Sequence, residues 1–384
     1  MDGIRTHFRD EEIERARRYH RPRYYAVLLD TALGLGVLGA LAFTAAGDQL
    51  YGLVDGVPWW ARALAFPSLV LACSTLVRLP VSLWSGFLHE RRWGFSTQSP
   101  FGWLADRAKS FAVGAVFTSA ALALLVVLAH ALPGAWPAAA AAAFAALVLV
   151  VSFVAPVLLE PVFNRFAPLP DQALADDLRA LGARAGVPVR DVLVADASRR
   201  TRKENAYVSG LGGTRRVVLF DTLLSRAPIQ ELRLIVAHEL GHRRLRHVAK
   251  WTGLGMAGSA AAVLVVWALV PDVSDPRNLP AVMLVFTVLE LAASPFNAWL
   301  SRRWERDADR FSLGLTHDPD GYVTAHRRLA VRNLADLDPP RAAYLFLFTH
   351  PTPSERIAAA GSTRADLASA EPLRRLRQPL RPEP

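Results

Sequence analysis

The apolar positions of this chain gather into six long runs, and each run is long enough to cross a lipid bilayer. A membrane core needs about 20 mainly apolar residues per helix. The six runs cover residues 24–46, 61–88, 110–132, 136–159, 251–270 and 279–300. The pattern therefore predicts a mainly α-helical integral membrane protein with about six transmembrane helices. An even number of crossings puts both ends of the chain on one side.

The polar stretches between and after these runs predict a soluble part with a small β-sheet. Residues 172–185 have helical spacing, residues 191–195 and 216–220 resemble strands, and residues 229–247 return to helical spacing. Residues 301–313 continue the sixth run as a charged helix. The expected division is a polar N-terminal segment 1–23, transmembrane helices one to four in 24–160, a soluble segment 161–250, helices five and six in 251–300, a soluble helical segment 301–372 and a disordered tail 373–384.

Composition and charge add an orientation to this picture. The apolar share of 52% over 384 residues and the mean hydropathy of +0.22 exceed those of ordinary soluble proteins. Short loops rich in Lys and Arg stay in the cytoplasm. Seven arginines lie within residues 5–23, and four basic residues lie within residues 91–109, whereas the opposite loops hold almost none. We therefore expect a multi-pass protein of the cell membrane with both termini and segment 161–250 in the cytoplasm.

The net charge of +10 is then mostly a topological signal, strengthened by attraction to anionic lipid at the inner surface. The lipid bilayer is accordingly an expected partner. Nucleic acid is not, because no aromatic-rich basic motif accompanies the arginines.

The chemistry of the chain centres on residues 238–242, which read His-Glu-Leu-Gly-His. Residues four apart lie one turn apart on a helix, so His238 and His242 can bind one zinc ion. Glu239 can then reach a water molecule at the metal as general base. The apolar residues just before His238 indicate a helix that is buried on one face and holds its ligands rigidly. The alternative is a helix with two incidental surface histidines.

A catalytic zinc ion normally takes three protein ligands, so a further donor must lie elsewhere in the chain. Glu305 is the best candidate, because two membrane crossings after His242 return it to the same side as the histidines. Asp309 lies one helical turn beyond Glu305 and can accept the second N–H of a zinc-bound histidine. The charge count used no information from the histidine motif, so the agreement is independent support.

Four other residues within or beside the apolar runs stand out. An ionisable group inside a membrane is a functional candidate by default. Glu290 is expected to face the interior of the helix bundle or a water-filled chamber, and Arg78 to extend to the inner surface. Cys73 is expected to be a small buried side chain, and His247 a simple basic residue at the membrane surface.

With these motifs in place, the chain resembles the type I CAAX prenyl proteases, which are membrane-embedded zinc endopeptidases that trim prenylated C-terminal tails. The resemblance rests on residues 238–242 and on Glu305 with Asp309 after a second pair of apolar runs. Similar stretches recur in order at residues 92–96, 161–170, 205–207 and 350–351, and together span about Phe8 to Ile357. Eukaryotic members carry one more N-terminal membrane helix that this sequence does not match, so we expect the chamber that such helices enclose to be built differently.

The resemblance implies roles for further residues. Asn205, Ala206 and Tyr207 match the strand that holds substrate backbone in extended form beside the zinc helix. His350 matches the histidine that supports the oxyanion, and Arg356 the arginine that orients this site. On the residues alone, Asn205 would be a turn residue and His350 a loop or capping residue.

The predicted activity is zinc-dependent hydrolysis of peptide bonds, with one zinc ion per chain held by His238, His242 and Glu305. Glu239 takes a proton from the attacking water and returns it to the leaving amine, while His350 supports the oxyanion. The expected partner is a peptide or protein substrate, lipidated or membrane-associated. Two alternatives remain open: a bacterial quality-control zinc protease acting on unfolded or membrane peptides, and a non-catalytic zinc-binding membrane scaffold.

Overall fold

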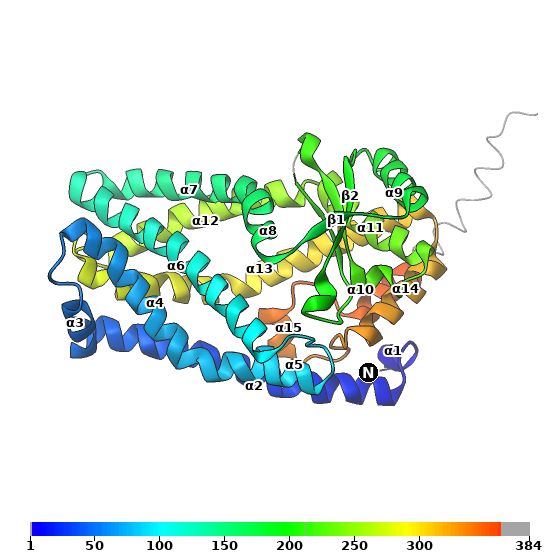
Figure 1. Cartoon of the computed structure of the whole chain (residues 1–384), viewed down its shortest axis with the longest axis horizontal. Helices are drawn as coiled ribbons and strands as arrows, with labels where there is room; N and C mark the ends of the chain where they lie inside the picture. The colour runs from blue at the N-terminus through cyan, green and yellow to red at the C-terminus, as the bar shows by residue number, and fades with distance from the viewer. Residues whose placement is uncertain (1, 211, 362–384) are drawn as a thin grey trace, which may run out of the picture.

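The computed structural model describes residues 2–210 and 212–361. Within this part of the chain, six segments are helical, long and apolar enough to cross a membrane, and each overlaps one of the six predicted runs. Their principal helices are α2 (Asp10–Phe43), α4 (Trp59–Leu83), α6 (Pro100–Ala131), α7 (Trp136–Val154), α12 (His247–Leu269) and α13 (Leu279–Thr316). They run side by side along the long axis of the molecule (Figure 1). The predicted tail 373–384 lies outside the described residues.

The sheet lies at one end of the molecule, and most of the length of the long helices lies toward the other end (Figure 1). The long helices share a buried apolar core near their far ends, which includes Leu41, Phe66, Leu125 and Val266. Many other apolar side chains along the helices are exposed, as expected for a protein whose helices contact lipid tails. The short helices are α1 (Asp2–Arg5), α3 (Ala45–Gly52), α5 (His89–Arg92), α8 (Glu160–Phe163) and α10 (Asp221–Leu224).

The described residues of the soluble end form one four-stranded sheet in the order β1-β2-β4-β3. Its strands are β1 (Phe166–Pro168), β2 (Asp191–Ala195), β3 (Ala206–Ser209) and β4 (Arg216–Phe220). The pair β2 and β4 is parallel, and the other pairs are antiparallel. Helices α9 (Gln172–Arg184) and α11 (Ile229–Arg244) share a buried core with the sheet. Strand β3 lies at the edge of the sheet and contacts α11.

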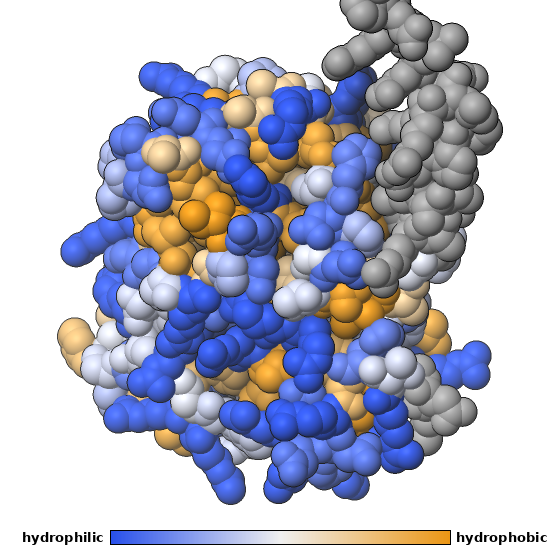
Figure 2. Space-filling view, turned by 90° about the vertical axis from the view of Figure 1, so that its right-hand side faces the viewer, coloured by the Kyte–Doolittle hydropathy of each residue, from blue (hydrophilic) through white to orange (hydrophobic). Residues whose placement is uncertain are grey.

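The last part of the chain returns to the soluble end and joins it to the first part. Helices α14 (Pro319–Arg332) and α15 (Arg341–Leu347) follow α13 there. Phe8 and Ala16 from the N-terminal segment pack with Ala330, Leu337 and Ile357 in one buried cluster. The face of this end shown in Figure 2 is mostly polar, with apolar patches between the polar side chains.

Two predicted boundaries fall inside continuous helices. Helix α2 begins at Asp10, before the first apolar run, and α13 continues to Thr316, beyond the last one. The membrane helices therefore extend into the soluble end as single rods. This continuity matters for the site because Glu305 lies on the extension of α13.

The two charged residues predicted in the membrane helices have different surroundings. Arg78 of α4 forms an ion pair with Asp30 of α2, with Nε 3.0 Å from Oδ1. The pair offsets part of the cost of placing an ionised group within a membrane helix. The Glu290 side chain is exposed on α13, so its orientation toward an interior chamber stays a prediction.

Candidate metal centre

Helix α11 presents the two histidines because its other faces are held by apolar packing. Leu232, Val236 and Leu240 are buried against the sheet and α9. Gly241 lets α13 approach closely, because a Cβ atom on this residue would lie 3.1 Å from Phe311 and 3.2 Å from the Ala308 carbonyl oxygen. The close approach brings Glu305, which precedes Ala308 by one turn of α13, to the histidines of α11.

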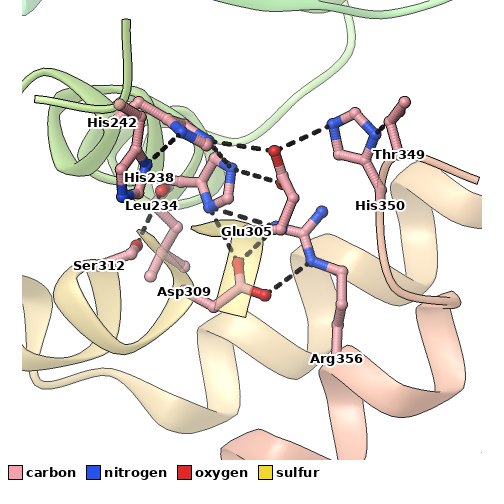
Figure 3. Close-up of polar contacts among 10 residues, drawn as sticks. Leu234, His238, His242, Glu305, Asp309, Ser312, Thr349, His350 and Arg356 are labelled. Atoms are coloured by element: carbon pink, nitrogen blue, oxygen red, sulfur yellow. Dashed lines mark hydrogen bonds and ion pairs between the residues drawn. The ribbon is translucent and has the colours of Figure 1, made fainter. Parts of the chain in front are cut away.

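Three predicted ligands meet at one point (Figure 3). The Nε2 atoms of His238 and His242 lie 3.1 Å apart. Glu305 places Oε2 at 3.2 Å from the first of these nitrogens and Oε1 at 3.2 Å from the second. His238 and Glu305 are 7% and 5% exposed, so the cluster is largely withdrawn from solvent.

The donor set fits a zinc ion. Tetrahedral zinc with Zn–N bonds of about 2.05 Å separates its nitrogen ligands by about 3.3 Å, close to the spacing of the two Nε2 atoms. Two imidazole nitrogens and a carboxylate form one of the common ligand sets of catalytic zinc sites. Two nitrogen lone pairs and a buried carboxylate that face one another repel unless a proton or a metal cation lies between them.

Asp309 and Arg356 hold one of these histidines in place. The Nδ1 atom of His238 lies 2.8 Å from Oδ1 of Asp309, which can only accept a hydrogen bond. Asp309 also accepts two hydrogen bonds from Arg356, whose Nη2 atom lies 3.2 Å from the same Nδ1 atom. The carboxylate is the closer neighbour, so His238 carries its proton on Nδ1 and directs the lone pair of Nε2 at the metal position.

A cavity of about 440 Å³ opens beside the ligand cluster. His238, Glu239 and His350 line it, and so do Asn205, Asn333 and Phe348. Burial raises the pKa of the Glu239 carboxyl above its usual value, which makes this group a stronger base. Glu239 therefore lies beside the metal position and faces space in which a substrate can bind.

His350 lies on the opposite side of Glu305 from the two α11 histidines (Figure 3). Its Nε2 atom is 3.3 Å from Oε1 of Glu305, and its Nδ1 atom is 2.9 Å from the Thr349 hydroxyl. The side chain is 59% exposed. The imidazole is thus close to the metal position and accessible from the cavity.

The three residues predicted to bind substrate differ in their surroundings. Asn205 lines the cavity, and its Oδ1 atom accepts a hydrogen bond of 2.9 Å from the Ala206 backbone N–H. Ala206 is only 2% exposed. The Tyr207 hydroxyl points to Glu160, 3.4 Å away. Of the three side chains, only that of Asn205 lies along the cavity.

The prediction that His247 is a simple basic residue at the membrane surface was wrong. His247 is 2% exposed, and its Nδ1 atom lies 3.0 Å from Nδ1 of the ligand His242. A left-handed backbone turn at Arg246 creates this contact. Sequence spacing gives no signal for such a turn in an arginine.

The sequence also gave no signal for a polar cluster beside the cavity. Arg328 of α14 contacts the buried carboxylates of Glu204, just before β3, and of Glu231 in the first turn of α11. Asn333 binds the backbone N–H and C=O of Glu204, both at 2.9 Å. These residues are far apart in sequence, and only the fold brings them together.

Comparisons with known proteins agree with the geometry. The chain matches the model of peptidase family M48 over residues 168–364. Residues 2–165 match the CAAX prenyl protease N-terminal model, described as five membrane helices. In the described part of this chain, that range contains the four membrane-length helical segments built around α2, α4, α6 and α7.

Individual relatives are similar over most of their length. The chain is 29% identical to the uncharacterized metalloprotease YhfN of Bacillus subtilis, covering 77% of this chain and 72% of that protein. It is 27% identical to CAAX prenyl protease 1 of Saccharomyces cerevisiae, covering 78% and 72%. The crystal structure of S. mikatae Ste24p superposes with a TM-score of 0.79 at 25% identity, covering 92% of this chain and 89% of that one.

Fold and site together define a multi-pass membrane zinc metalloprotease. The chain belongs to peptidase family M48 and resembles the CAAX prenyl proteases within it.

Proposed function

We propose that this protease hydrolyses peptide bonds of substrates that bind in extended form in the cavity beside His238, with Glu239 as general base. The observation that carries the proposal is the convergence of His238, His242 and Glu305 beside a cavity that His238 and Glu239 both line. A site that only stabilised the fold would have no use for a carboxylate at this position.

Each residue of the site has a role in this reaction. His238, His242 and Glu305 would hold a zinc ion, which would supply Lewis-acid chemistry at the point where water attacks the peptide carbonyl. Glu239 accepts the proton of the attacking water and then donates it to the departing amine. His350 donates a hydrogen bond to the oxyanion from the open side of the site. Asp309 and Arg356 keep the His238 ring in its ligating orientation.

The edge of the sheet supports a short stretch of pairing with the substrate backbone. Phe220 N–H donates to Asn205 C=O, so the backbone groups of Ala206 and Val208 point away from β4. The Val208 carbonyl already accepts a hydrogen bond from Arg243 of α11. We therefore place the substrate contact at Asn205 and Ala206, where the Asn205 side chain gives up its bond to the Ala206 N–H.

The charge pattern supports a cytoplasmic site. The N-terminal segment with its seven arginines lies at the same end of the molecule as the sheet and the ligand cluster (Figure 1). The substrate would then be a cytoplasmic or membrane-associated peptide. The names of the eukaryotic relatives point to prenylated C-terminal tails, whereas a bacterial quality-control role would require unfolded or membrane peptides.

One experiment tests both the chemistry and the substrate class. Detergent-purified protein is given a fluorogenic farnesylated CAAX peptide and its unprenylated twin, and bound zinc is measured in the wild type and in Glu239→Gln. We expect zinc in both proteins and cleavage only by the wild type. A preference for the farnesylated peptide favours a prenyl-protease function, and equal cleavage of both peptides favours a quality-control protease. A wild type without zinc would overturn the proposal.

A further inference from the structure

The junction between the zinc helix and the fifth membrane helix places a further histidine, His247, against the metal site. Helix α11 ends at Arg244, and α12 begins at His247. Between them, Arg246 has φ of 57° and ψ of 32°, a left-handed conformation that costs a non-glycine residue about 1 kcal/mol or more. The turn directs His247 back toward His242, so a strained backbone maintains this contact.

The contact involves the nitrogen of His242 that does not face the metal position. His242 directs Nε2 at the ligand cluster, where it lies 3.1 Å from Nε2 of His238. Its Nδ1 atom lies 3.0 Å from Nδ1 of His247. An imidazole that ligates a metal through Nε2 keeps its proton on Nδ1, so His242 is the donor and His247 the acceptor.

Aromatic packing fixes the ring that accepts this hydrogen bond. His247 is 2% exposed and lies nearly parallel to the indole of Trp304, with ring centroids 5.2 Å apart and an interplanar angle of 10°. Trp304 is held edge to face by Trp251 at 4.8 Å. It directly precedes the ligand Glu305, so the same packing supports both ligands.

We propose that His247 is a positioning residue that accepts the Nδ1–H of His242 and thereby sets the zinc affinity of the site. It does for His242 what Asp309 does for His238. The neutral imidazole of His247 leaves the His242 ring uncharged when it accepts this hydrogen bond. The carboxylate of Asp309 instead makes His238 a more basic ligand. The inference rests on the proposed zinc site and is independent of the substrate.

Three substitutions separate the hydrogen bond from the packing. Asn at position 247 can place its side-chain oxygen near the site of the imidazole Nδ1 atom, whereas Gln carries its oxygen one bond farther out, near the Nε2 position. Phe keeps a ring against Trp304 but accepts no hydrogen bond. Exposed His130, which stacks on Trp59 at the far end of the membrane helices, provides the matched control as His130→Asn.

The measurement is the zinc dissociation constant of metal-stripped protein in competition with a chelator. Thermal unfolding of the stripped protein is recorded alongside as a check on the fold. We expect His247→Asn and His130→Asn to bind zinc nearly as tightly as the wild type. His247→Gln and His247→Phe should bind it about 10- to 100-fold more weakly, the usual effect of losing a hydrogen-bond partner of a metal ligand.

Two outcomes would overturn the proposal. One is that His247→Phe binds zinc as tightly as the wild type, because His247 would then act only through packing. The other is that His247→Asn binds zinc as weakly as His247→Gln. The visible absorption of the Co²⁺-substituted protein gives a second reading, because a reoriented His242 shifts the ligand field even if one variant folds poorly. A wild type that binds no zinc would instead contradict the metal site itself. Zinc binding without peptide cleavage would leave this inference intact.

Discussion

Gly241 shows how a single hydrogen atom in place of a side chain sets the geometry of the metal site. It lies between the two ligand histidine positions of α11 and against α13, with Phe311 and the Ala308 carbonyl already at contact distance from an added Cβ atom. Helix α13 carries Glu305, so any separation of the two helices moves that carboxylate away from the histidines. The residue is therefore important for packing and for ligand spacing at once.

We predict that Gly241→Ala destabilises the protein by about 1–3 kcal/mol, the cost of overpacking a well-filled contact, and weakens zinc binding. Gly258→Ala in α12 is the matched control, because an added Cβ atom there meets no other atom within 4 Å. Alanine favours a helix over glycine by about 1 kcal/mol, so the control should be neutral or stabilised. Thermal unfolding in detergent and a zinc titration check both variants; equal behaviour would contradict the packing argument.

At the scale of secondary-structure elements, α14 connects the edge strand to the zinc helix. Arg328 contacts Glu204 through Nη1 at 2.6 Å and reaches Glu231 through Nε. The carboxylate side chains of Glu204 and Glu231 are 0% and 7% exposed, and among the described residues Arg328 is the cation that pairs with both. Asn333 adds two hydrogen bonds to the Glu204 backbone. Helix α14 and Asn333 thereby fix the segment before β3 relative to the start of α11.

We predict that Arg328→Met destabilises the protein by about 3–5 kcal/mol, because it leaves two buried carboxylates without their cation. Adding Glu204→Gln and Glu231→Gln should recover much of this loss, since the uncompensated charges are then removed. The triple variant should still show a raised KM for peptide, because Asn205 is no longer held at its distance from Glu239. Thermal unfolding and steady-state kinetics measure the two effects. A triple variant no more stable than Arg328→Met would show that charge is not the cause.

The sequence predicted those elements whose signal is local. Apolar runs alone define membrane helices, and a spacing of four residues puts His238 and His242 on one helix face. Strands β1 and β3 have three and four residues, too short to show an alternating pattern, and they form through pairing with distant segments. The resemblance to known proteases, not the local pattern, pointed to the strand at Asn205. The contacts of His247 and Arg328 depend on a left-handed turn and on tertiary packing, which no local pattern encodes.

At the scale of the whole molecule, the site and the basic N-terminal segment share one end, so the side of the membrane that holds one also holds the other. The loop between α6 and α7 lies at the opposite end (Figure 1). The excess of Lys and Arg around the soluble end requires that end to be cytoplasmic if the loops follow the usual rule. The protease would then act only on substrates on the inner side.

Single cysteines test this orientation directly, because the chain has one cysteine, Cys73, which can be replaced by serine. Gly134 is exposed in the loop between α6 and α7, and Arg226 is exposed in the segment between α10 and α11. Each is replaced by cysteine in turn. We predict that a membrane-impermeant maleimide labels position 134 in intact cells but labels position 226 only after the membrane is opened. The two variants control for each other, since both thiols are accessible in the lysate. Labelling of position 226 but not of position 134 in intact cells would contradict this orientation. It would show that the active site lies outside the cytoplasm.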